Sequence, residues 1–160
     1  MNNPSPDMKS DVEKALTQAG VTEISVAQDR DKGVITLSGN VETIEQKENA
    51  DYATKSVSGH DVVSNQIGVR PAGFEKEAKE VDSNLDIAIG ANFAASLAAR
   101  QIDSDVQYNV NNGVLTLHGD VNSQNKRHDL EKMAAGIANV QQVVNELQVK
   151  EQKATGTSTR

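Results

Sequence analysis

The sequence contains no cysteine and no tryptophan, and its aromatic residues are two tyrosines and two phenylalanines. The lack of cysteine excludes a disulfide scaffold, a cysteine-based zinc site, a thiol nucleophile and a lipid-modified cysteine. With so few aromatic rings, any hydrophobic core must be built from Val, Ile, Leu and Ala. A nucleic-acid-binding surface would need a basic stripe with aromatic rings for base stacking, whereas this chain carries a net charge of −7. We therefore expect no nucleic-acid partner.

Long apolar runs are also missing. No stretch approaches the roughly 20 apolar residues that a bilayer-spanning helix needs. The first ten residues, MNNPSPDMKS, have neither the basic region nor the apolar core of a secretory signal. We expect no transmembrane segment, and a chain that is either cytoplasmic or a mature form whose signal has been removed.

A nine-residue sequence occurs twice, as GVITLSGNV at 33–41 and as GVLTLHGDV at 113–121. Later residues recur at the same offset of 80, namely Val57, Val63, Asn65, Ile67 and Val69 with Ile137, Val143, Asn145, Leu147 and Val149. A single recurring strand would not keep this register across a helix and a further strand, so we predict a duplicated domain. The predicted organisation is a first domain at 1–70, a linker at 71–80, a second domain at 81–150 and a disordered tail at 151–160.

Each copy has the pattern of a helix, two strands, a helix and a last strand. Asn112-Gly113 is a strong signal for a type I′ hairpin, which makes the first two strands antiparallel. Thr43 and Gln46 have capping-box spacing and mark the start of the second helix. The last strand follows a helical crossover, which favours a parallel relation to the second strand. The predicted fold class is α+β, with two tandem small αββαβ domains, each a three-stranded mixed sheet covered on one face by two helices.

Asn65 and Asn145 share strand parity with apolar neighbours, so both amides should point toward the core and need partners there. One interpretation is that each amide fixes the backbone of a nearby turn or helix end. The other interpretation is contact with a ligand.

The pattern Gly-Val-(Ile/Leu)-Thr-Leu-x-Gly-x-Val, followed by a helix and by VVSNQIGV or VVNELQV, closely resembles the BON domain (bacterial OsmY and nodulation). The resemblance covers nearly the whole chain as two copies. The first copy departs from it at His60, where the second copy has Val140. The resemblance implies a non-catalytic, periplasmic module of the bacterial envelope, associated with phospholipid surfaces and with osmotic or envelope stress.

The sequence gives little support for catalysis. His60, His118 and His128 are scattered, and no pair has zinc-ligand spacing. The chain has no G-x-S-x-G motif, no phosphate loop and no dinucleotide fingerprint. We predict that the protein is not an enzyme and has neither a metal nor another cofactor.

The segment LDIAIGANFAASLAAR at 85–100 reads as a helix that is apolar on two sides. Alignment of the copies assigns Ile89, Phe93 and Leu97 to the core. At about 100° per residue, the opposite side then carries Ile87, Ala91, Ala94 and Ala98. A helix with two apolar sides usually has a neighbour on each, so we expect this second face to contact the first copy, another chain or lipid.

The predicted lipid- or partner-binding residues are Ile87, Ala91, Ala94, Ala98, Arg100, Lys126 and Arg127. Lys126-Arg127-His128 is the compact basic run of the chain; it reads as a solvated helix face that could meet lipid phosphates. Two functions stay open: a peripheral protein on an anionic phospholipid surface, or an interaction scaffold for another envelope protein. The sequence leaves the oligomeric state undetermined.

Overall fold

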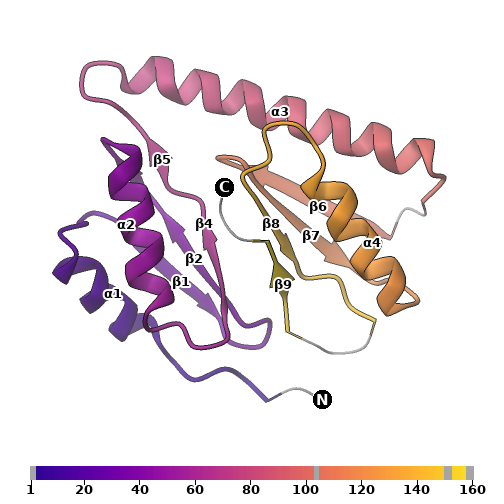
Figure 1. Ribbon diagram of the computed structural model, residues 1–160, viewed down its shortest axis with the longest axis horizontal. Helices are drawn as coiled ribbons and strands as arrows, with labels where there is room; N and C mark the ends of the chain where they lie inside the picture. Colours follow the sequence, from indigo (N-terminus) through magenta and orange to yellow (C-terminus); the bar gives the residue numbers. More distant parts are fainter. Residues whose placement is uncertain (1–2, 103–104, 150–152, 158–160) are drawn as a thin grey trace. The chain divides into compact units, whose positions relative to one another are not determined.

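The computed structural model describes residues 3–102, 105–149 and 153–157, and the chain divides into two units (Figure 1). The first unit is Asn3–Asp82, and the second contains the described residues from Ser83 onward. The first unit has the elements α1 (Lys9–Gln18), β1 (Ser25–Asp29), β2 (Val34–Ser38), β3 (Asn40–Val41), α2 (Ile44–Lys55), β4 (Val62–Asn65) and β5 (Gly68–Val69). Next come α3 (Glu75–Ala99), β6 (Val106–Asn111), β7 (Val114–Gly119), α4 (Gln124–Ala135), β8 (Gln142–Asn145) and β9 (Thr155–Gly156).

The two units share one sheet topology. In the first, β1 and β2 are antiparallel and β4 lies parallel to β2; in the second, β6, β7 and β8 repeat these relations. The register keeps the offset of 80, because Ile35 pairs with Val63 and Leu115 pairs with Val143. The predicted α+β class and strand directions are confirmed.

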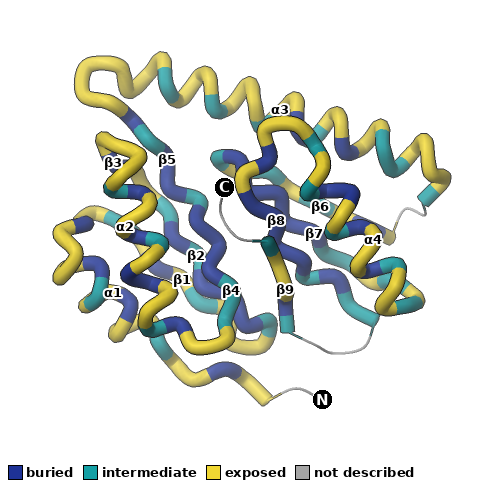
Figure 2. Tube along the Cα trace, in the orientation of Figure 1, coloured by how far each residue is buried: buried dark blue, intermediate teal, exposed yellow. Residues whose placement is uncertain are grey.

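Each unit has an aliphatic core between its helices and one face of its sheet (Figure 2). In the first unit, Val12 and Leu16 of α1 lie in the same buried cluster as Ile35, Leu37 and Val63 of the sheet. Because all three sheet residues have the same parity, the helix packs on a single face.

The core of the second unit includes the predicted inner side of α3. Ile89 and Phe93 are fully buried, and Leu97 packs against the same cluster. Phe93 meets Tyr108 edge to face, with ring centroids 5.0 Å apart. This aromatic pair packs α3 against the hairpin strand β6.

The local turn and cap predictions are also confirmed. Thr43 accepts the backbone N–H of Gln46, and the Gln46 side chain accepts the N–H of Thr43, which completes the capping box of α2. Asn112 and Gly113 have φ of 48° and 81°, as a type I′ turn requires.

Asn65 and Asn145 are buried and fully engaged with backbone groups. Their partners are Lys47 O at 3.2 Å and Ile67 N–H at 3.3 Å for Asn65, and Arg127 O and Leu147 N–H, both at 3.1 Å, for Asn145. Each amide therefore joins the end of the last strand to the helix before it. These contacts support the interpretation of the two amides as backbone-fixing groups.

The helix predicted at 85–100 is longer than expected, because α3 begins at Glu75. Residues 75–80 of the predicted linker are therefore helical. Their sequence EKEAKE places opposite charges four residues apart, as Glu75 with Lys79 and Lys76 with Glu80, which stabilises a helix, and it contains neither Gly nor Pro. The charge clustering that suggested a linker is here a helical pattern.

The prediction of disorder at 151–160 is wrong for the part that the structure describes. Thr155–Gly156 form β9, which pairs antiparallel with β8 through Asn145 and Thr155. The second sheet thus has a fourth strand, where we predicted three.

Arg127 holds this added strand, and its prediction as a surface residue is wrong. Its side chain is buried and donates to Leu147 O (2.8 Å), Asn145 O (3.0 Å), Lys153 O (3.2 Å) and Thr155 Oγ1 (3.1 Å). Burial lowers the pKa of the Arg127 guanidinium, and the nearby charge of Glu131 opposes that shift. A guanidinium has five N–H donors, so it can satisfy several carbonyl groups that would otherwise be left without a donor.

Replacing Arg127 by Met should lower the free energy of unfolding by about 2–4 kcal/mol, because buried acceptors would lose a charged donor. Arg127→Lys should recover only part of this loss, since an ammonium cannot reproduce the planar fork. Chemical denaturation followed by circular dichroism measures both. The control is Lys132→Met, an exposed site on the same helix, which should change stability by no more than about 0.5 kcal/mol. Equal stability of the Arg127 and Lys132 variants would contradict the anchoring role.

Candidate functional site

A groove of about 430 Å³ lies in the first unit, between β3 and the first turns of α3. We call it the α3 groove. It is lined by Asn40, Val41, Glu42, Arg70, Glu75, Lys76 and Lys79. Its volume falls within the range of about 300–1,000 Å³ that is common for small-ligand sites.

Two short strands build one wall of the α3 groove. β3 pairs in parallel with β5, so Val41 lies beside Val69. The N–H of Arg70 donates to Val41 O at 2.7 Å and continues this ladder. A turn closed by Phe74 N–H and Pro71 O then leads directly into α3. The groove therefore lies where the chain leaves the sheet and enters the helix.

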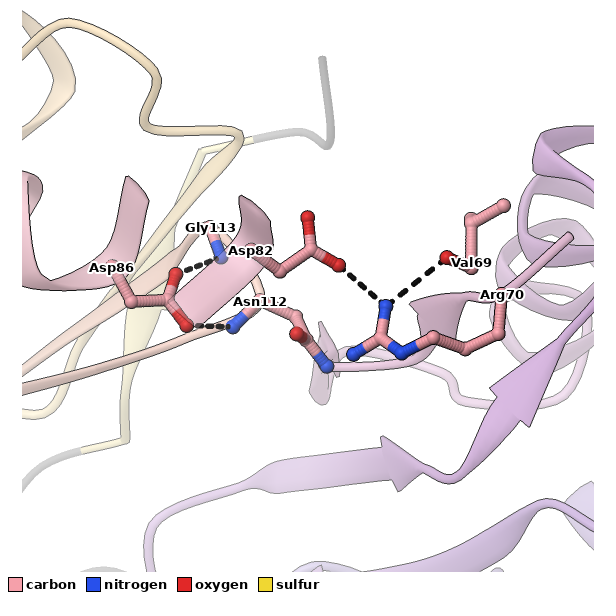
Figure 3. Close-up of polar contacts among 6 residues, drawn as sticks. All are labelled: Val69, Arg70, Asp82, Asp86, Asn112 and Gly113. Carbon is pink, nitrogen blue, oxygen red and sulfur yellow. Dashed lines mark hydrogen bonds and ion pairs between the residues drawn. The ribbon is translucent and has the colours of Figure 1, made fainter. Parts of the chain in front are cut away.

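Arg70 fastens α3 to the end of β5 (Figure 3). Its side chain is only 10% exposed, and Nη1 donates to Asp82 Oδ2 at 2.5 Å and to Val69 O at 3.0 Å. A Cβ at Gly68 would lie 2.7 Å from the guanidinium carbon of Arg70, so the observed position of the Arg70 side chain requires glycine at 68. The Arg70 charge is thus balanced by Asp82 within the first unit.

The Glu75 side chain binds the backbone just before the beginning of α3. Its carboxylate accepts the N–H of Gly73 at 3.0 Å. Hydrogen bonds from the backbone N–H of Gly73 and of Glu75 itself lower the pKa of this carboxyl group. The side chain therefore remains ionised, and its negative charge suits the positive end of the helix.

Three further charged residues line the α3 groove. Lys76, Lys79 and Glu42 are exposed, and none of them forms an ion pair with another described residue. Together with Glu75, the groove presents two cations and two carboxylates. The aromatic ring of Phe74, which directly precedes Glu75, is 64% exposed.

The second predicted face of α3 is exposed in the second unit. Ile87 is 71% exposed, and Ala91, Ala94, Ala98 and Arg100 are exposed as well.

Asp86 helps to orient this part of the helix. Its carboxylate accepts the N–H groups of Asn112 and Gly113 at 2.8 and 2.9 Å (Figure 3). The hairpin therefore binds the side of α3 that carries the core residues, which leaves the side with Ile87 outward.

The basic run on α4 does not form the surface that we predicted. Lys126 is half-buried, and Arg127 points into the sheet, where backbone carbonyls surround it. The sequence of adjacent basic residues does not by itself indicate which side chain points into the protein. The sequence does carry one signal, because a basic residue recurs at an offset of 80, as Lys47 and Arg127. In the structure both of these residues are buried.

The sequence interpretation missed the α3 groove. Arg70, Lys76 and Lys79 fell within or beside the predicted linker, and Glu42 lay in the connection before α2. The usable signal was the helical spacing of the charges in EKEAKE, which places a helix directly after the last strand of the first copy.

Within 3–102, 105–149 and 153–157, His, Asp and Glu side chains do not gather in threes where a metal ion could bind. No described helix combines the length and the apolar character that crossing a membrane requires.

The chain is similar to curated and solved proteins. It is 35% identical over 131 residues to the osmotically-inducible protein Y of Escherichia coli (strain K12), which covers 81% of this chain and 63% of that protein. The C-terminal domain of CdsD, the structural protein of the type III secretion system of Chlamydia trachomatis, aligns with a TM-score of 0.36 at 14% identity. That alignment covers 92% of this chain and 98% of the other.

The BON domain matches twice, at residues 6–71 and 81–151, and these matches contain both copies of the repeated sequence and both sets of αββαβ elements, except for residues 75–80 at the beginning of α3. The chain belongs to the BON domain family.

Proposed function

We propose that the protein is a non-catalytic, peripheral phospholipid-binding protein that maintains the bacterial envelope under osmotic or envelope stress. Its similarity to an osmotically inducible protein supports the stress role, and membership of the BON family supports a place in the envelope, with the periplasm as its location. The observation that carries the lipid part is the exposed Phe74, which the exposed Lys76 and Lys79 follow closely in the sequence.

An exposed aromatic ring with lysines beside it suits the boundary between lipid headgroups and acyl chains. The ring of Phe74 can enter the apolar side of this boundary. Lys76 and Lys79 lie two and five residues farther along the chain and can place their ammonium groups among the phosphates while their stems cover apolar surface.

The overall charge limits how such binding works. With a net charge of −7, the chain as a whole is repelled by an anionic surface. Attraction must therefore come from local contacts, at about 1 kcal/mol for each lysine near the surface, and salt must weaken it.

Co-sedimentation with vesicles of phosphatidylethanolamine and phosphatidylglycerol, at low and at high salt, tests this proposal. The unchanged chain should bind at low salt and less at high salt. Lys76→Gln with Lys79→Gln should weaken low-salt binding by about 30-fold, the equivalent of two lysines. Phe74→Ala should weaken binding at both salt concentrations, because the ring contributes through apolar burial.

The matched control is Lys9→Gln with Lys14→Gln, which removes the same charge from the exposed side of α1. This control should bind as the unchanged chain does. Equal losses in the two lysine pairs would place the attraction in overall charge and remove the α3 groove from the proposal. No vesicle binding at either salt concentration would overturn the phospholipid function.

A second candidate function is that of a protein-interaction scaffold that uses the outward face of α3. The observation in its favour is that Ile87 is 71% exposed and lies on one side of the helix with Ala91, Ala94 and Ala98. Small side chains let another helix approach closely, while they offer little area for insertion into lipid.

Ala94→Glu tests the scaffold function, because it places a charge in the middle of that face. We expect an unchanged circular dichroism spectrum and a loss of self-association by light scattering, or of vesicle binding where the face contacts lipid. Asn92→Glu is the control, since it adds the same charge to an exposed position about 200° away around the helix. If Ala94→Glu changes neither self-association nor vesicle binding, this face contacts only solvent and the scaffold function is wrong.

A further inference from the structure

The charges of the α3 groove are balanced, and they are of two kinds. Arg70 is already paired with Asp82, so this cation is engaged inside the unit. The remaining charged groups on the lining are the ammonium groups of Lys76 and Lys79 and the carboxylates of Glu42 and Glu75. A site of this composition complements a ligand that carries both signs of charge.

We propose that the α3 groove binds a zwitterion with a phosphate and a primary ammonium group, as in phosphoethanolamine. The two lysines would hold the phosphate, and the two carboxylates would accept hydrogen bonds from the ammonium group. This assignment rests on the proposed phospholipid function for its membrane source, and it adds the headgroup class to it.

A purely anionic headgroup fits the groove less well. Its phosphate would gain the contacts with Lys76 and Lys79, but Glu42 and Glu75 would meet no positive charge and would repel it. The N–H groups of Gly73 and of Glu75 itself lower the pKa of this carboxyl group, which favours its charged form and so the repulsion. A headgroup with only a negative charge therefore contacts the two lysines and leaves the two carboxylates without a cationic partner.

A quaternary ammonium group also fits poorly. Choline has no N–H to donate to a carboxylate, and proteins recognise it with aromatic rings. None of the described residues that line the groove is aromatic. A primary ammonium has three donors, which match the oxygen acceptors of Glu42 and Glu75.

The neutral part of the lining agrees with a small polar ligand. Asn40 supplies an exposed amide that can donate or accept, and the buried Val41 is the apolar residue of the lining. A volume of about 430 Å³ is at the small end of the usual range for ligand sites.

The experiment uses the full chain with two forms of the ligand. Vesicles of phosphatidylcholine containing either phosphatidylethanolamine or phosphatidylglycerol test the membrane form by co-sedimentation. Soluble O-phosphoethanolamine tests the free form by NMR titration, with inorganic phosphate as the comparison. We expect the chain to bind the vesicles with phosphatidylethanolamine more tightly than those with phosphatidylglycerol. We also expect O-phosphoethanolamine to shift the signals of Lys76 and Lys79 at lower concentration than phosphate does.

Glu42→Gln separates the ammonium contact from the phosphate contact. It should weaken binding of phosphatidylethanolamine vesicles by about three- to five-fold, the upper part of the range for one exposed ion pair, without weakening the phosphatidylglycerol interaction. Glu45→Gln is the matched control, because it removes an exposed carboxylate three residues away that does not line the groove. It should leave both interactions unchanged.

The outcomes separate this inference from the function on which it rests. Tighter binding to phosphatidylglycerol, with no effect of Glu42→Gln on phosphatidylethanolamine, overturns the zwitterion site and leaves the phospholipid function standing. Binding of soluble O-phosphoethanolamine without binding to any vesicle supports the site and overturns the membrane function. The absence of both interactions overturns both.

Discussion

A buried asparagine amide at the end of the last parallel strand is the contact on which each unit of this protein depends. Asn65 and Asn145 each donate to the backbone of the preceding helix and accept the N–H of the residue two positions after the strand ends. A buried amide is costly unless its partners are present, so both bonds must form together. They fix the distance between helix and sheet, and the aliphatic core fills the space that they define. With so few aromatic residues in the chain, a directional contact of this kind specifies a packing that aliphatic side chains alone would leave loose.

The duplicated framework explains how much of the structure the sequence could predict. Strand directions follow from a pattern that recurs at an offset of 80, whereas the capping box at Thr43 and the type I′ turn at Asn112-Gly113 each follow from the local chemistry of one copy. The inner side of α3 was predictable from the comparison of the copies, because Phe93 and Leu97 correspond to Val12 and Leu16 of α1. The extent of α3 was not, since Pro71 and Gly73 mark a turn and the charges after them are equally typical of a solvated linker or a helix.

Burial of charge is where the sequence was least informative. Lys126 and Arg127 are adjacent basic residues, yet only Arg127 points into the sheet. Its position on α4 decides this, because Arg127 has helical i, i+3 and i+7 spacing to the buried Leu130 and Ala134 and so lies on the inner side of the helix. The carbonyl acceptors that stabilise the guanidinium come from Asn145, Leu147 and Lys153, which only the folded chain brings together. Sequence reasoning can identify the helix, but it does not identify these acceptors.

The two copies diverge most in the segment that follows their last paired strand, and this divergence gives the first unit its groove. After the first copy, the chain forms the opening turns of α3 from Glu75. At the equivalent positions of the second copy, which lie 80 residues later, Thr155–Gly156 form β9. The wall residues differ as well, since Glu42 corresponds to Asn122 and Gly68 corresponds to Gln148. A side chain at position 68 would collide with Arg70, so the glycine and the Arg70–Asp82 pair belong to one arrangement. The core can therefore remain duplicated while the groove is particular to one copy, because its residues lie outside the contacts that the fold requires of both.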